Sequence, residues 1–134
     1  MIELFSGEVD VTKVLPEIKN HIFGSARSMM VACNLMTQAG TTPTLDLAIQ
    51  AKIGDYWYNL IRFSQFTTTL GMKVITLKKD FVVAASVAPT ANPAVSTGEL
   101  LQAQLWGDTL RVSYALGGTS PVYSFWVRAY PFNY

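Results

Sequence analysis

The chain has 134 residues, half of them apolar, and carries only 10 basic and 9 acidic side chains, for a formal net charge of +1. That length fits one domain and excludes a multidomain enzyme. Charged residues make up 14% of the chain, against about 25% in an ordinary soluble domain, so an isolated monomer has little charge with which to cover its surface. The near-neutral charge offers no electrostatic footprint for nucleic acid or for an anionic membrane, and we expect neither as a partner.

We also expect no membrane-spanning helix and no internal disulfide bond. The two uncharged stretches, 28–45 and 81–98, are interrupted by proline, asparagine and other polar residues, and they are too polar for a helix in a bilayer. The first residues show no basic segment followed by an apolar run, so we expect no export signal and synthesis in a cytoplasm. The single cysteine, Cys33, cannot form an internal disulfide, and its apolar surroundings predict a small buried residue.

The N-terminal part of the chain lacks a clear strand pattern. Within residues 11–22, Val14, Leu15, Ile18 and Ile22 fall on one helical face, although Pro16 limits any helix there to a short or broken turn. We therefore expect an N-terminal arm over residues 1–25, with at most a short helix, followed by a domain over residues 26–134.

That domain is expected to be all-β. Apolar and polar residues alternate over 45–53 and 110–116, which is typical of half-buried strands. The segment 122–130 has the same period, but bulky side chains stand on both of its faces. Further candidate strands are 28–36, 57–63, 72–78, 81–87 and 100–105. About seven or eight short antiparallel strands predict a jelly-roll-like sandwich or barrel.

Turn chemistry separates these strands. The segments Gly40–Pro43 and Gly118–Pro121 share the pattern Gly-Thr-(Thr/Ser)-Pro, and we interpret them as the turns of two β-hairpins. Two further turns are expected at Gly54-Asp55 and Gly107-Asp108. The segment 87–98 is uncharged and contains two prolines, which predicts an extended loop. Such a loop either lies against a surface or crosses between the two sheets of a sandwich, and the sequence leaves both open.

The sequence contains few residues that could form a catalytic site. His21 is the only histidine, the aspartates are scattered singly, and no nucleophile elbow, phosphate-binding loop, zinc spacing or calcium loop is present. We expect no enzyme, no catalytic residues, no metal and no cofactor.

Apolar residues near the ends and in the loop are the candidates for contacts with other proteins. Apolar termini fray unless something holds them, and aromatic residues are common in interface cores. Docking on the chain's own domain is the alternative. The candidate interface residues are Leu4, Phe5, Ile22, Phe23, Pro89, Pro93, Tyr130 and Phe132.

Three segments carry a family resemblance: residues 39–50, 54–57 and 110–125. They resemble small structural proteins of tailed bacteriophages, in which such blocks recur in capsid decoration, or cement, proteins of jelly-roll-like fold. The resemblance does not extend to residues 1–38 and 64–106. It implies a virion protein on the capsid exterior, often a homotrimer, that binds the major capsid protein and stabilises the assembled shell without chemistry.

Two other functions remain open. A jelly-roll carbohydrate-binding module would use exposed aromatic rings, with Trp57, Trp106 and Tyr130 as candidates. A phage tail or head–tail connector component would form a ring or a tube instead of a trimer.

Overall fold

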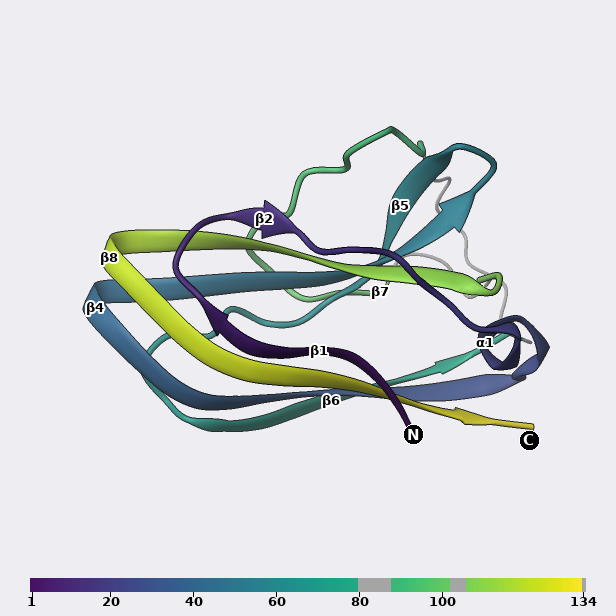
Figure 1. Ribbon diagram of the computed structural model, residues 1–134, viewed down its shortest axis with the longest axis horizontal. Helices are drawn as coiled ribbons and strands as arrows, with labels where there is room; N and C mark the ends of the chain where they lie inside the picture. The colour runs from purple at the N-terminus through teal and green to yellow at the C-terminus, as the bar shows by residue number, and fades with distance from the viewer. Residues whose placement is uncertain (80–87, 102–105, 134) are drawn as a thin grey trace.

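The computed structural model describes residues 1–79, 88–101 and 106–133. These residues are almost entirely β, which confirms the expected class, and every strand pairing is antiparallel (Figure 1). The elements in chain order are β1 (Ile2–Val9), β2 (Lys13–Val14), β3 (Ile18–Lys19), α1 (His21–Ser25), β4 (Ser28–Ile53), β5 (Tyr56–Arg62), β6 (Gly71–Lys78), β7 (Leu100–Leu101) and β8 (Thr109–Phe132).

The two longest strands build the molecule. β4 and β8 pair from Ser28 opposite Phe132 to Ala51 opposite Leu110. This long ribbon bends sharply near its middle, at one end of the molecule, so that its two halves lie over one another as two layers (Figure 1). One pair of long strands therefore contributes to both sheets of the sandwich.

The remaining strands extend each layer. The layer that we call the β6 layer has the order β1, residues 121–132 of β8, residues 28–39 of β4, and β6. The opposing layer, called the β5 layer, contains β2 and β3, residues 109–117 of β8, residues 44–53 of β4, then β5 and β7. Each layer therefore has one outer face and one face toward the core.

The core lies between the layers and follows the two-residue alternation of the strands. The apolar positions of 45–53 and 110–116 include the buried Leu47, Ile49 and Val112, as predicted. These strands are not half-buried, however, because Gln50, Arg111 and Ser113 on the opposite face are buried as well. Cys33 also points into this core and is fully buried, as expected. Burial raises the pKa of its thiol, which makes it an unreactive core residue.

The two Gly-Thr-(Thr/Ser)-Pro segments are not hairpin turns, and that prediction was wrong. They lie opposite each other on neighbouring strands, with Thr41 paired to Thr119, and together they form the corner of the folded ribbon. Gly40 has φ +114° and Gly118 has φ +92°, and each lies against the backbone of the other strand. The repeated pattern thus reflects one shared corner, since both strands must bend at the same place.

The prediction of a turn at Gly54-Asp55 is confirmed. It joins β4 to β5, with Ile53 paired to Tyr56, and Gly54 has φ +60°. Glycine at the first central position suits a two-residue hairpin whose twist matches that of its strands.

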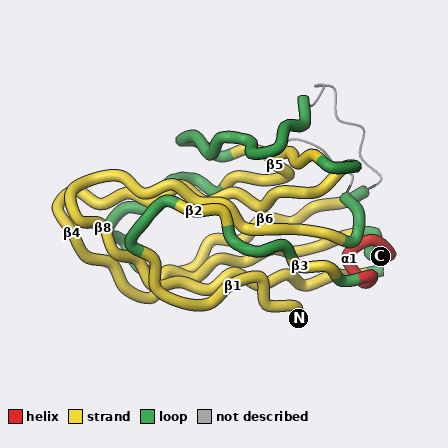
Figure 2. The backbone as a smooth tube through the Cα atoms, turned by 45° about the horizontal axis from the view of Figure 1, so that its top comes forward, coloured by secondary structure: helices red, strands yellow, loops and turns green. Residues whose placement is uncertain are grey.

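The N-terminal segment differs from the expected arm with a helix over 11–22. β1 pairs with β8 in the β6 layer, while β2 and β3 pair with the other half of β8 (Figure 2). The helix lies later, at His21–Ser25, where the side chain of Asn20 accepts a hydrogen bond from the Ile22 amide. Pairing with β8 overrides the weak helical period, so residues 1–25 follow the edges of both layers.

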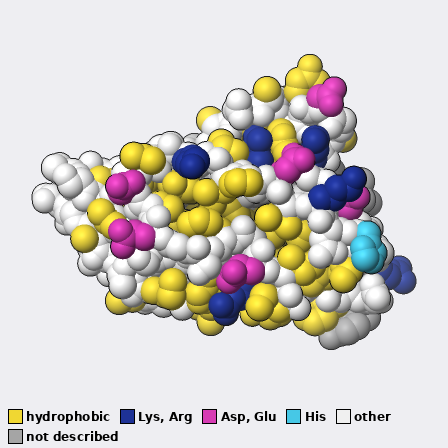
Figure 3. Space-filling view, in the orientation of Figure 1, with side chains coloured by type: hydrophobic (Ala, Val, Ile, Leu, Met, Phe, Trp, Pro, Cys, Tyr) yellow, Lys and Arg dark blue, Asp and Glu magenta, His cyan; other side chains and the backbone are white. Residues whose placement is uncertain are grey.

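The other predicted strands have mixed outcomes. Segments 57–63 and 72–78 correspond to β5 and β6. The predicted strand 81–87 and residues 102–105 of the predicted strand 100–105 lie outside the described residues. Within the described part of the chain, no helix has the length and apolar character needed to cross a bilayer. The visible surface carries many hydrophobic and uncharged side chains, with charges scattered among them (Figure 3).

Candidate interaction surface

The outer face of the β5 layer is covered by a segment that we call the strap, residues 88–99. The strap approaches β5 through Thr90, whose amide donates to the Trp57 carbonyl at 3.0 Å and whose carbonyl accepts from the Trp57 amide at 2.8 Å. Both arrangements left open for this loop apply: it lies against a surface of its own chain, and it belongs to the connection from β6 in one layer to β7 in the other.

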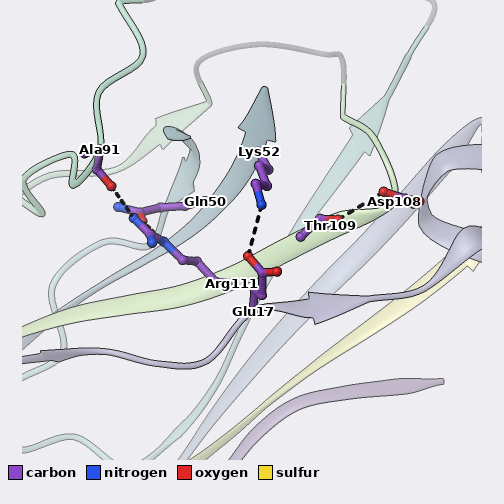
Figure 4. Close-up of polar contacts among 7 residues, drawn as sticks. All are labelled: Glu17, Gln50, Lys52, Ala91, Asp108, Thr109 and Arg111. Atoms are coloured by element: carbon purple, nitrogen blue, oxygen red, sulfur yellow. Dashed lines mark hydrogen bonds and ion pairs between the residues drawn. The ribbon is translucent and has the colours of Figure 1, made fainter. Parts of the chain in front are cut away.

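Polar side chains of the β5 layer hold the strap by its backbone carbonyls (Figure 4). These side chains stand at outward positions of β4, β5 and β8, where the alternation places polar residues. Because each donor binds a carbonyl oxygen, the strap can be uncharged and still be fixed along its length. The bonds are Arg111 Nη2 to Ala91 at 3.2 Å, Gln50 Nε2 to Pro93 at 3.1 Å, Asn59 Nδ2 to Ala94 at 2.9 Å and Arg62 Nε to Gly98 at 3.0 Å.

Gln50 and Arg111 form the centre of this contact. Gln50 is fully buried, and its Oε1 accepts from Arg111 Nε at 2.7 Å. The Arg111 guanidinium also lies 4.0 Å from the centroid of the Trp57 ring. Burial lowers the pKa of Arg111, an effect opposed by the Glu17 carboxylate. The hydrogen bonds satisfy donors that would otherwise be costly to bury, so the strap and the face stabilise each other.

The outer face of the β6 layer is different. Its outward side chains mix apolar residues with Asn34, Thr76 and Arg128, and the exposed fractions of Met36, Met72 and Val74 are 40%, 58% and 47%. Met72 and Trp126 lie on either side of β4, since Asn34 pairs with both. We call this surface the methionine face and define it by Met30, Met36, Met72, Val74, Trp126 and Tyr130.

One ion pair lies within the methionine face, because Arg128 stands between Trp126 and Tyr130 on β8 and pairs with Ala32. Arg128 Nε lies 3.6 Å from Glu3 Oε1, and the Arg128 guanidinium lies 4.0 Å from the centroid of the Trp126 ring. The Nε atom is buried and has no hydrogen-bond partner among the described residues. The face therefore carries one charge near its centre, which covers one side of the Trp126 ring.

The candidate interface residues do not form one surface. Leu4 and Phe23 are buried in the chain's own core, so the structure does not offer their side chains to a partner. Phe5 is half-buried, with its ring 5.0 Å from that of Phe125. Only Ile22 is clearly exposed, at 44%. The other candidates, Pro89, Pro93, Tyr130 and Phe132, are half-buried.

The methionine face was missed by sequence reasoning, although a signal for it exists. In segment 28–36 three of the five outward positions, Met30, Ala32 and Met36, are apolar, and the other two are Ser28 and Asn34. Bulky side chains on both faces, as in 122–130, indicate a strand that is covered on both sides. Applying the same inference to 28–36 would have indicated a second covered face.

The three tryptophans do not form a stacking platform for sugars. Trp57 and Trp106 are buried, and the Trp106 indole donates to the Phe23 carbonyl at 2.7 Å. A cation also lies over each ring: Arg111 over Trp57, Lys79 at 4.6 Å over Trp106, and Arg128 over Trp126. Sugar stacking needs a bare ring face, so the geometry argues against Trp57 and Trp106, two of the three residues named for a carbohydrate-binding module. The third, Tyr130, is half-buried.

The described residues do not form an assembled catalytic site. No group of three or more His, Cys, Asp or Glu side chains there could hold a metal ion. Comparison with protein-family models, with curated proteins and with solved structures finds no match to this chain. The contrast between the two outer faces is therefore the feature from which a function can be argued.

Proposed function

We propose that this chain is a structural virion protein of a tailed bacteriophage, a decoration protein that binds the exterior of an assembled icosahedral capsid as a homotrimer. The resemblance of residues 39–50, 54–57 and 110–125 to such proteins first suggests this function. The proposal requires binding surfaces and no catalytic chemistry.

The order of the strand halves supports a jelly-roll assignment. One layer reads β1, β8, β4, β6, and the other reads β2 with β3, β8, β4, β5, β7. Two antiparallel sheets wound from one folded ribbon resemble a double-sheet jelly roll. Viral capsid domains and lectins both use that fold, so the fold alone does not choose between them.

The methionine face is the observation that carries the proposal. Exposed apolar side chains gathered on one sheet face mark a surface for another protein, whereas isolated exposed residues do not. Methionine is flexible and polarisable, and it adapts to irregular partners. We assign this face to the major capsid protein. A ligand that binds the assembled shell and not its free subunits stabilises the shell by mass action.

The test uses empty, expanded shells that are assembled from the major capsid protein of the same phage genome. The wild-type protein should co-sediment with the shells and raise the temperature at which they fall apart. The variant Met30→Lys/Met36→Lys should weaken binding by about 100-fold or more, because two charges would be buried in an apolar contact. Ile53→Lys, at the exposed tip of the β4–β5 hairpin, is the matched control and should bind normally.

Three outcomes would contradict the proposal. Wild-type protein that does not bind the shells would exclude decoration. Equal binding by Met30→Lys/Met36→Lys would remove the methionine face from it. A ring or tube of many copies, seen by electron microscopy, would favour the tail or connector function instead.

A further inference from the structure

A charged side chain, Arg128, stands at the centre of the methionine face. It lies between Trp126 and Tyr130 along β8, and it pairs across the sheet with Ala32 of β4. Val74 of β6 occupies the next position in the same row, because it pairs with Ala32 from the other side. These neighbours are apolar or aromatic, so a protein that covers the methionine face also covers this guanidinium.

The contacts of Arg128 within its own chain leave its hydrogen-bonding capacity largely unused. The guanidinium lies 4.0 Å from the centroid of the Trp126 ring, which attracts the charge without a hydrogen bond. Its Nε lies 3.6 Å from Glu3 Oε1, which is an ion pair but is too long for a hydrogen bond. That Nε is buried and has no hydrogen-bond partner among the described residues. The Arg128 side chain is 31% exposed, so part of it is open to a partner.

A purely apolar surface would be a costly cover for Arg128. A buried charge needs a partner that supplies both opposite charge and hydrogen bonds. Glu3 supplies charge from the edge of the face, at a distance beyond that of a hydrogen bond. The N–H donors of the guanidinium therefore require an acceptor from the molecule that covers the face. A carboxylate meets this requirement best, because it accepts two parallel hydrogen bonds from one guanidinium.

We infer that the partner of the methionine face presents to Arg128 an aspartate or glutamate side chain set in an apolar surface. This inference rests on the proposed function, in which that partner is the major capsid protein. Arg128 then determines specificity: apolar area supplies most of the contact, and the guanidinium selects a surface whose carboxylate meets it. Arginine beside tryptophan at the centre of a contact is typical of the residues that dominate binding between proteins.

Two other occupants fit the face less well. Face-to-face contact of two copies centred on Arg128 would bring two guanidinium groups together, and like charges across an interface oppose association. An anionic lipid surface attracts clusters of basic residues, whereas this face carries one and the whole chain has a net charge of only +1. A carboxylate on a protein surface therefore matches the single charge and its apolar surroundings better than either.

The test measures binding to the same empty, expanded shells with Arg128→Leu, which removes the charge and keeps the position apolar. We expect the dissociation constant to rise by about 30-fold or more, because the capsid carboxylate is left buried without its partner. A contact made by apolar area alone predicts the opposite, since leucine would remove the cost of covering a charge. Arg128→Lys should raise the dissociation constant by about tenfold, because lysine keeps the charge but cannot make two parallel hydrogen bonds.

Glu3→Gln provides a second readout, of opposite sign. The Glu3 carboxylate competes with the capsid carboxylate for Arg128 and repels it, so Glu3→Gln should tighten binding by about threefold. Lys19→Leu removes one positive charge from an exposed position of β3, in the other layer. It is the matched control and should bind as the wild type does. Circular dichroism and thermal denaturation show whether each variant is folded.

Four outcomes would overturn the inference while leaving the test of capsid binding intact. The first is Arg128→Leu that binds the shells as tightly as the wild type or more tightly. The second is weaker binding by Glu3→Gln, because Glu3 would then support the contact. The third is a wild-type dimer in light scattering that Arg128→Leu dissociates, and the fourth is Arg128-dependent binding to phosphatidylglycerol vesicles. Wild-type protein that does not bind the shells would overturn the proposed function together with this inference.

Discussion

The two outer faces of this sandwich are built from the same two strands and are covered in different ways. On the β5 layer, the outward side chains are polar, and the chain's own strap lies over them. On the β6 layer, the outward side chains include the exposed Met36, Met72 and Val74, and no described segment of the chain lies over them. β4 and β8 contribute to both faces, so the difference arises from side chains and not from topology.

The two faces differ in what can cover them. Polar side chains that become buried need partners of defined geometry, and the strap carbonyls supply them within the chain. Apolar side chains need only to be removed from water, so a separate protein can cover them. The strap therefore satisfies one face internally, while the methionine face stays available to a partner.

The corner of the ribbon is the most sensitive point, because it separates the two faces. Gly118→Ala should lower the free energy of unfolding by about 3 kcal/mol or more, because a Cβ there would meet the Thr42 carbonyl oxygen and φ is +92°. Chemical denaturation measures the loss. Gly107→Ala, where a Cβ meets nothing within 4 Å, should change stability by less than about 1 kcal/mol. Equal effects would show that the corner is not strained by a side chain.

Removing the polar support of the strap should have the next largest effect. Gln50→Leu leaves the buried Arg111 Nε without its acceptor and frees the Pro93 carbonyl, so stability should fall by about 2–3 kcal/mol. Hydrogen exchange should rise in the strap and stay low in the β6 layer. Gln38→Leu, at a half-buried position in the other half of β4, should cost less than about 1 kcal/mol. An unprotected strap in the wild type would contradict this account.

The smallest effect concerns the core beneath the methionine face. Burial raises the pKa of Cys33 in the folded state, so its thiol ionises first in the unfolded chain. Stability should therefore be retained below the unfolded pKa of about 8.5 and be lost as the pH rises, by about 1.4 kcal/mol at one unit above it.

Cys33→Ala provides the matched control for this pH dependence. Denaturation from pH 7 to 9.5 should show a steeper loss in the wild type than in Cys33→Ala, because only the wild type has this thiol. Parallel slopes for the two proteins would mean that the thiol is accessible in the folded state.

The alternation of residues identified the fold class and much of the core. The segments 45–53 and 110–116 carry a period of two that depends only on which face of a strand is buried, and this period is local. The Gly54-Asp55 turn was also predictable, because a two-residue hairpin turn depends on its own dihedral angles. In the same way, the single buried cysteine and the scarcity of charge follow from the sequence alone.

The pairing of distant strands could not be predicted from the sequence. The same turn residues suit the turn of a hairpin and the corner of a folded ribbon. Gly40 and Gly118 showed where the chain bends, but only the pairing of Thr41 with Thr119 made them one corner. Similarly, Gln50 is a polar residue at an outward position, and only the strap makes it fully buried. The sequence by itself determined which residues can face water or core. The tertiary structure decided which segments cover them, since contacts between distant segments depend on the folded path of the whole chain.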